Sequence, residues 1–289
     1  MMKKLLVSLM ALVLMFSISN LAVAESITYP SRDVQIPATV VIPDGDGPFP
    51  MVVLAHGHGG SKDENIGFGA IADALKAEGI ASIRMDFPGC GESTESFQLN
   101  TLTNMKQDVL NAVAYLTSTY AIDTAKVGLF GYSMGGRVAL ELLGENDYPF
   151  AAVALLAPAN STEDLKKLFG GADNWETLKA TAEANGYADF TTIYGQQQQL
   201  SKEWFADLDK VADPAAAAAA AYTGPALVIY AKDDEAVSPS VSAGVAATLL
   251  AEVVQATGDS HSYGFYSDKT DVLNTVVNGV ASFFLKTLK

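Results

Sequence analysis

Cysteine is almost absent from this chain, since Cys90 is the only one among 289 residues. A single thiol cannot form an internal disulfide, so the fold does not depend on such a cross-link. Cys90 lies in the segment DFPGCGES, far along the chain from any obvious base. We therefore expect it to be a buried or loop residue and predict no catalytic thiol.

Histidine is nearly as scarce, with His56, His58 and His261 as the only three. His56 and His58 stand two positions apart, a spacing that metal ligands can have. The chain supplies no HExxH motif and no further histidine or cysteine to complete such a site. We therefore predict no metal ion and no cofactor.

Positive charge is also in short supply: 18 lysines and arginines stand against 33 aspartates and glutamates, for a formal charge of −15. So acidic a surface repels nucleic acids and anionic lipids, and it disfavours polyanionic substrates. We therefore expect neither a nucleic acid nor a membrane surface as a partner, and interpret the charge as a contribution to solubility.

Long apolar runs are missing after residue 24, so no later stretch is predicted to cross a membrane. The start of the chain has a basic segment at 1–4, an apolar segment at 5–16 and the tripeptide AVA at 22–24. This order is typical of a bacterial-type secretory signal peptide, and the apolar segment is short for an anchor helix. We predict cleavage after residue 24 and a secreted or periplasmic protein with a single domain, residues 25–289.

Strand-like and helix-like patterns alternate along most of that domain. Near-continuous apolar strands separated by helices are what a parallel sheet covered on both faces requires. We therefore predict an α/β fold with a mostly parallel, doubly wound sheet, preceded by two short strands. The strand-like runs lie at 51–60, 80–89, 126–131, 150–158, 225–234 and 252–261, and the helical segments at 66–78, 101–119, 134–143, 239–250 and 270–288.

The alternation is interrupted at 161–222. This segment is polar, contains GQQQQ and a run of alanines, and holds both tryptophans, Trp175 and Trp204. We predict a mostly helical lid inserted after the sixth or seventh strand. So small an insert is not expected to bury two tryptophans easily, which makes Trp175 and Trp204 candidates for lining an aromatic substrate pocket. The alternative is that such aromatic residues form the core of the lid itself.

One serine stands at an abrupt change of periodicity, in the segment KVGLFGYSMGGRVALELL. A strand-like run ends at Gly131, a helical pattern begins after Ser133, and residues 131–135 fit G-x-S-x-G. A serine at such a strand-to-helix turn has a strained backbone and an exposed hydroxyl. Side chains at Gly131 and Gly135 would collide with neighbouring backbone. We predict that Ser133 is a nucleophile.

A serine hydroxyl is a weak nucleophile until a base removes its proton. His261, in TGDSHSYGF after the predicted last strand, is the only histidine beyond Ser133. A carboxylate after an intervening strand should orient it, and AKDDEAVSP supplies Asp233 and Asp234. We choose Asp234, keep Asp233 open, and expect the other of the pair to be solvated or to cap a helix. Asp259 is a weaker alternative, since it is too near His261 in sequence.

Negative charge that develops on a substrate carbonyl needs N–H donors already in place. The N–H of Met134, directly after the serine, is one candidate for this oxyanion hole. The glycine-rich HGHGG follows an early strand, and the N–H of His58 is the other candidate.

With HGHGGSKDE, RMDFPGCGES, GYSMGG, AKDDEAVSP and GDSHSY in this order, the chain resembles the α/β-hydrolase superfamily over nearly all of residues 27–288. More narrowly it is similar to cinnamoyl or feruloyl esterases, which share the HG-x-x-G-x-K/R-x-E loop and a lid after the sixth strand. The resemblance implies Ser133, Asp234 and His261 as a catalytic triad, and His58 and Met134 as the oxyanion hole. It also implies hydrolysis of carboxylic esters through an acyl-enzyme.

The resemblance suggests hydroxycinnamoyl esters of plant polysaccharide as substrates, without a cofactor. Three alternatives stay open: a general short-acyl carboxylesterase, a serine peptidase of the same fold, and a catalytically silent binding protein.

Overall fold

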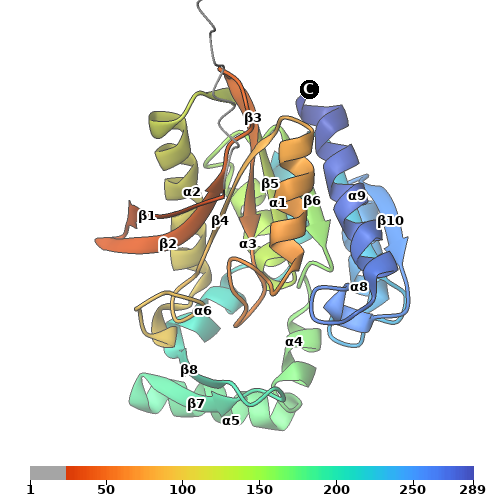
Figure 1. Cartoon of the computed structure of the whole chain (residues 1–289). Helices are drawn as coiled ribbons and strands as arrows, with labels where there is room; N and C mark the ends of the chain where they lie inside the picture. Colours follow the sequence, from red (N-terminus) through yellow and green to blue (C-terminus); the bar gives the residue numbers. More distant parts are fainter. Residues whose placement is uncertain (1–23) are drawn as a thin grey trace, which may run out of the picture.

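The computed structural model describes residues 24–289, so the predicted signal peptide, apart from its last residue, lies outside the described residues. At its centre is an eight-stranded sheet in the order β1-β2-β4-β3-β5-β6-β9-β10 (Figure 1). β1 pairs antiparallel with β2 and β2 with β4, whereas the remaining pairs run parallel. The predicted mostly parallel α/β sheet is therefore confirmed. The strands are β1 Glu25–Ser31, β2 Val34–Val41, β3 Phe49–Ala55, β4 Ala81–Met85, β5 Ile122–Tyr132, β6 Ala152–Leu156, β9 Ala226–Ala231 and β10 Glu252–Ala256.

The central strands are apolar because both faces of the sheet are covered. Every residue of β4, β6 and β9 is buried. A Cβ on Gly128 of β5 would meet Phe284 of α9, whereas one on Gly131 would meet the start of α3. Residues three apart on a strand point to opposite faces, so α9 and α3 cover opposite sides of the sheet.

The helices between these strands are close to those predicted. α1 and α9 contact each other and lie together over one face in Figure 1. No helix within residues 24–289 has both the length and the apolar character that crossing a membrane requires. The helices are α1 Gly67–Ala77, α2 Leu102–Thr119, α3 Met134–Glu145, α8 Pro239–Thr248 and α9 Thr270–Leu288.

The predicted insert follows β6, the sixth strand, and is only partly helical. Most of its glutamine stretch lies in β8, a strand of the antiparallel β7–β8 hairpin, where Gln198 and Leu200 are buried and Gln197 and Gln199 are more exposed. In Figure 1 most of the insert lies beyond the carboxyl ends of the parallel strands, while α7 packs against α3. The elements are α4 Thr162–Leu168, α5 Ala172–Asn185, β7 Tyr187–Thr191, β8 Gln197–Ser201, α6 Lys202–Lys210 and α7 Pro214–Ala221.

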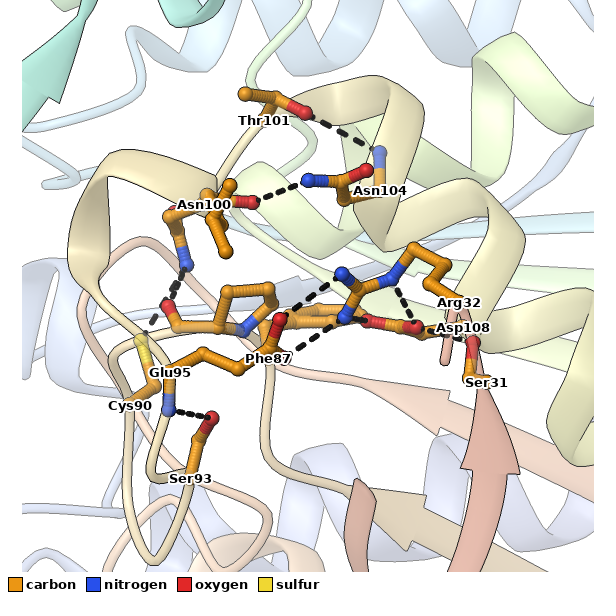
Figure 2. A network of polar contacts seen from close by, with 12 residues as sticks. Ser31, Arg32, Phe87, Cys90, Ser93, Glu95, Asn100, Thr101, Asn104 and Asp108 are labelled. Carbon is orange, nitrogen blue, oxygen red and sulfur yellow. Dashed lines mark hydrogen bonds and ion pairs between the residues drawn. The ribbon is translucent and has the colours of Figure 1, made fainter. Parts of the chain in front are cut away.

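A charged network holds the segment between β4 and α2 (Figure 2). The guanidinium of Arg32, in the β1–β2 turn, donates to both carboxylate oxygens of Glu95 and of Asp108 on α2. Ser31 also donates to Asp108, at 2.6 Å. Because these groups are largely buried, the bidentate contacts fix the segment firmly to the sheet.

Cys90 lies in the same segment and is buried. The side-chain amide of Asn100 donates to its sulfur at 3.5 Å and to the carbonyl of Pro88 at 2.7 Å (Figure 2). Burial raises the pKa of the Cys90 thiol to about 12, so it stays protonated. The expectation of a buried residue is confirmed. The backbone N–H of Asn100 also donates to the carbonyl of Phe97, in the short helix η1 (Phe97–Leu99), at 2.9 Å.

Candidate active site

Ser133 occupies the sharp turn between β5 and α3. Its backbone has φ 53° and ψ −114°, a conformation that costs energy for any residue with a side chain. A Cβ on Gly131 would come within 2.3 Å of the carbonyl oxygen of Gly135, and one on Gly135 within 2.0 Å of that of Ala55. The predicted close approach at both glycines is confirmed, and the turn leaves the Ser133 side chain partly exposed.

The structure brings Ser133, His261 and Asp234 together. The Oγ of Ser133 lies 2.9 Å from His261 Nε2, and His261 Nδ1 lies 2.8 Å from Asp234 Oδ2. An ionised carboxylate can only accept hydrogen bonds, so the hydrogen of neutral His261 resides on Nδ1. The lone pair of Nε2 therefore faces the Ser133 hydroxyl, which is the arrangement a general base needs.

Asp234 is buried at the end of β9 and fully hydrogen-bonded. Its Oδ1 accepts the N–H groups of Ala236 and Val237 at 2.9 and 2.8 Å, and its Oδ2 accepts the hydroxyl of Tyr263 at 2.8 Å. Burial pushes its pKa up, but the bonds from His261, Val237 and Tyr263 outweigh that effect and hold the pKa below its ordinary value. The carboxylate is thus charged and fixed in direction.

Asp233 lies in the turn after β9, and its carboxylate bonds to backbone N–H groups rather than to His261. It is exposed, so the expectation that the other acid of the pair is solvated is confirmed. Its carboxylate accepts the N–H groups of Gly258 and Ser260 at 3.0 and 3.2 Å, so it supports the loop that carries His261. Asp259 accepts the N–H of Gly264 at 2.6 Å and shapes the same loop.

Two tyrosines that no sequence motif singles out also position this loop. The hydroxyl of Tyr132, next to the serine, donates to the carbonyl of His261 at 2.5 Å. The hydroxyl of Tyr263 accepts the N–H of Ala231 at 2.9 Å while it donates to Asp234. These contacts join residues far apart in the chain, so no local pattern could have revealed them.

His56 connects the glycine-rich loop to the segment that follows β4. Burial lowers its pKa to about 4, so the ring is neutral. Its Nε2 accepts the N–H of Phe87 at 3.0 Å, and its Nδ1–H donates to the carbonyl of Gly57 at 2.8 Å. His56 is thus a scaffold residue.

The peptide between Gly57 and His58 has a defined orientation. Its carbonyl oxygen accepts hydrogen bonds from His56 and from the N–H of Gly60, at 2.8 and 3.1 Å. In a trans peptide the N–H of His58 points to the opposite side. Within residues 24–289, neither this N–H nor that of Met134 has a hydrogen-bond acceptor. Two backbone donors are therefore available close to Ser133.

The side chain of His58 lies in an aromatic cluster formed by one residue of η1 and two residues of the insert. The ring centroids of Phe97, Phe169 and Trp204 lie 5.3, 5.4 and 5.6 Å from that of His58. Burial lowers the pKa of His58 to about 4, although a hydrogen bond to Gln198 opposes this effect. The imidazole is therefore neutral.

A chain of amides determines which nitrogen of His58 carries the hydrogen. The side chain of Gln196 donates to the carbonyl of Gly59 at 3.1 Å, and its oxygen accepts the amide of Gln198 at 3.0 Å. The oxygen of Gln198 then faces His58 Nε2 at 2.9 Å, so Nε2 carries the hydrogen. His58 Nδ1 is left as a buried acceptor with no partner among the described residues.

The expectation that so small an insert would not bury its tryptophans easily is wrong, and the alternative, that they form the core of the insert itself, is confirmed. Trp175 and Trp204 are 3% and 2% exposed. They pack against each other and against Phe169 and Phe205, with centroid distances of 5.7 Å or less. These four aromatic rings, packed edge-to-face or tilted, make a core large enough to cover both. The Nε1–H of Trp204 is nevertheless buried without a partner among residues 24–289.

No group of three His, Cys, Asp or Glu side chains within residues 24–289 is arranged to hold a metal ion. The chemistry that the described side chains can perform is nucleophilic. A serine hydroxyl, an imidazole and a charged carboxylate are joined by two hydrogen bonds, close to two backbone N–H groups.

Comparison with known proteins agrees with this geometry. Residues 52–275 match the family model described as "Alpha/beta hydrolase family". Esterase EstD of Thermotoga maritima is 32% identical over 135 residues, which cover 45% of this chain and 32% of the relative. Quorum-quenching protein AidA of Acinetobacter baumannii is 32% identical over 144 residues, covering 49% and 46%. The matches thus span less than half the length of these curated relatives.

Solved structures match over most of their length. Est1E from Butyrivibrio proteoclasticus with bound ferulic acid has a TM-score of 0.73 at 22% identity, covering 90% of this chain and 98% of that one. The esterase domain of a Rhodothermus marinus protein has a TM-score of 0.68 at 19% identity, covering 92% and 99%. At such identities the likeness shows a common fold.

Proposed function

The chain belongs to the alpha/beta hydrolase family, and from this premise we propose that it is a serine esterase that hydrolyses carboxylic esters through an acyl-enzyme. The observation that carries the proposal is the 2.9 Å approach of Ser133 Oγ to His261 Nε2, with Asp234 on the far side of the ring. The esterase name of the Thermotoga maritima relative supports the same activity.

In the proposed mechanism, His261 Nε2 removes the Ser133 proton as Oγ attacks the ester carbonyl. Asp234 holds the imidazole in place and stabilises the imidazolium that forms. The N–H groups of Met134 and His58 stabilise the negative oxygen of the tetrahedral intermediate. His261 then returns the proton to the departing alcohol, and activates the water that hydrolyses the acyl-enzyme.

For the acyl group we propose a hydroxycinnamoyl unit, such as those esterified to plant polysaccharides. The aromatic cluster around His58 suits a planar ring. The unpaired Nδ1 of His58 and Nε1–H of Trp204 supply one acceptor and one donor, which together match a phenolic hydroxyl. The bound ferulic acid of the Est1E structure supports this choice.

The activity is tested by replacing the nucleophile. Ser133→Ala should lower kcat for p-nitrophenyl acetate by several orders of magnitude, because a methyl group cannot form the acyl-enzyme. It should also abolish labelling by a fluorophosphonate probe. Ser118→Ala, an exposed change on α2, is the matched control and should leave both unchanged. Near-normal hydrolysis by Ser133→Ala would rule out the assignment, and an unlabelled, inactive wild type would indicate a binding protein.

The acyl preference is tested with methyl p-coumarate and methyl cinnamate, which differ only in the ring hydroxyl. One net hydrogen bond predicts a kcat/KM about tenfold higher for the coumarate. Equal values for the two esters, or a strong preference for p-nitrophenyl acetate over both, would favour a general short-acyl carboxylesterase. Hydrolysis of peptides would instead favour a serine peptidase.

We also propose that residues 1–24 direct export, so that the enzyme acts in the periplasm or outside the cell. The basic and apolar segments and the AVA tripeptide support this proposal. Sequencing of the amino terminus of the protein isolated from its source should begin at Glu25. A chain that still begins at Met1 would contradict it.

A further inference from the structure

Glu64 is a buried carboxyl group directly behind the site, and the proposed mechanism makes no use of it. It is 1% exposed and stands four residues after the glycine-rich loop. Within residues 24–289 it forms no ion pair with a lysine, arginine or histidine. A buried carboxyl without a cation is costly, so its retention here calls for a physical reason.

The carboxylate contacts the oxyanion loop through Gly57. The N–H of Gly57 donates to Glu64 Oε1 at 2.7 Å. A Cβ on Gly60 would come within 2.3 Å of the same oxygen, so the absence of a side chain there makes room for the carboxylate. A Cβ on Gly57 would lie 3.4 Å from both Glu64 Oε1 and the Cβ of Ser133, which places Gly57 between the carboxylate and the nucleophile.

The other carboxylate oxygen contacts the loop that carries His261. The hydroxyl of Tyr266 donates to Glu64 Oε2. The neighbouring Asn65 donates from its side chain to the carbonyl of Phe265 at 2.6 Å. Residues 64 and 65 both have positive φ, of 41° and 56°, so the turn aims two adjacent side chains at one loop. Glu64 therefore joins the oxyanion loop to the histidine loop.

From these contacts we infer that Glu64 is a positioning residue of the proposed esterase, which holds the Gly57–His58 peptide so that the His58 N–H stays directed to the oxyanion site. Gly57 is then fixed at both polar atoms: its N–H by Glu64, and its carbonyl by His56 and the N–H of Gly60. Burial raises the pKa of Glu64 to about 7, while the bonds from Tyr266 and Gly57 lower it.

This inference rests on the proposed esterase function, and three variants test it. Glu64→Met removes the acceptor at similar volume, and kcat for p-nitrophenyl acetate should fall at least tenfold while KM changes less than threefold. Glu64→Gln keeps an oxygen for Gly57 and gains an N–H for Tyr266, so its kcat should stay within about threefold of wild type. Asp63→Asn is the matched control, since this neighbouring acid pairs with Arg84 and does not contact the loop.

The thermal unfolding midpoint of each variant shows whether a loss of kcat comes from a displaced oxyanion loop or from a protein that is not folded. Should Glu64→Met fail to fold, Gly60→Ala displaces the carboxylate without removing it and should give the same loss of kcat. Wild-type kcat in the folded variant would overturn the positioning role, as would an equal loss in Glu64→Gln. A wild type that neither hydrolyses esters nor reacts with a fluorophosphonate would overturn the esterase proposal instead.

Discussion

Replacement of Asp234 by asparagine gives the sharpest test of how the site is oriented. Its Oδ1 accepts two backbone N–H groups, and its Oδ2 accepts His261 Nδ1–H and the Tyr263 hydroxyl. An asparagine that keeps its oxygen on the backbone donors must present its NH2 group to His261. The reverse orientation would set the NH2 group against two N–H groups, which is worse.

With an NH2 group beside Nδ1, His261 changes tautomer and carries its hydrogen on Nε2. That hydrogen then faces Ser133 Oγ, so the ring can no longer accept the serine proton. The expected loss in kcat is about 10⁴-fold, as for other triads in which the tautomer is reversed. This corresponds to about 5.5 kcal/mol of transition-state stabilisation. The geometry around Ser133 stays intact, so KM should change little.

The assay is steady-state hydrolysis of p-nitrophenyl acetate at pH 8, with Asp233→Asn as the matched control. Asp233 is the adjacent acid, but it is exposed and bonds only to the backbone of Gly258 and Ser260. Its replacement should cost less than tenfold. The reasoning is refuted if Asp234→Asn keeps a tenth or more of wild-type kcat, or if Asp233→Asn loses as much.

Two further predictions concern stability. Gly135→Ala would place its Cβ 2.0 Å from the carbonyl oxygen of Ala55, so unfolding in urea should show a loss of about 2 kcal/mol or more. Gly69→Ala, in α1 with nothing within 4 Å, should instead gain up to about 1 kcal/mol, and equal stabilities would contradict the packing argument. Burial raises the pKa of Glu64 to about 7. The free energy of unfolding should therefore be highest below about pH 4.5, where the group is protonated in both the folded and the unfolded chain. It should fall by on the order of 3 kcal/mol as the pH rises to about 7, because only the unfolded chain ionises over that range. The difference between Glu64→Gln and wild type, followed by urea unfolding across this range, should grow in favour of the variant, and a constant difference would disprove the shift.

Much of the fold was predictable because its signals are local. Apolar runs such as 150–158 and 225–234 indicate strands that are buried on both faces, and the structure has β6 and β9 there. The chain order of Ser133, the acidic pair Asp233 and Asp234, and His261 was also evident from the sequence. In the structure, Ser133 Oγ lies 2.9 Å from His261 Nε2. The strained turn at Ser133 was foreseeable because Gly131 and Gly135 flank it.

The insert was less predictable because its polar residues pair across space. Gln198 lies in a strand that pairs with β7, and its side chain bonds to His58. Composition reveals neither contact. Trp175 and Trp204 were expected to resist burial, yet they cover each other. A count of the large residues in a segment does not tell whether their rings pack against one another.

The linear order of residues was enough to predict the parallel sheet, the sharp turn at Ser133 and the histidine that lies beside it, since each depends on periodicity, on chain order or on strict steric limits near one position. The contact of His261 with Asp234 and not Asp233, the hydrogen bonds that orient three histidines and the contacts of Glu64 were determined only in three dimensions. Each of these depends on the direction of a hydrogen bond between residues distant in the chain, and that direction exists only after the sheet has brought the loops together.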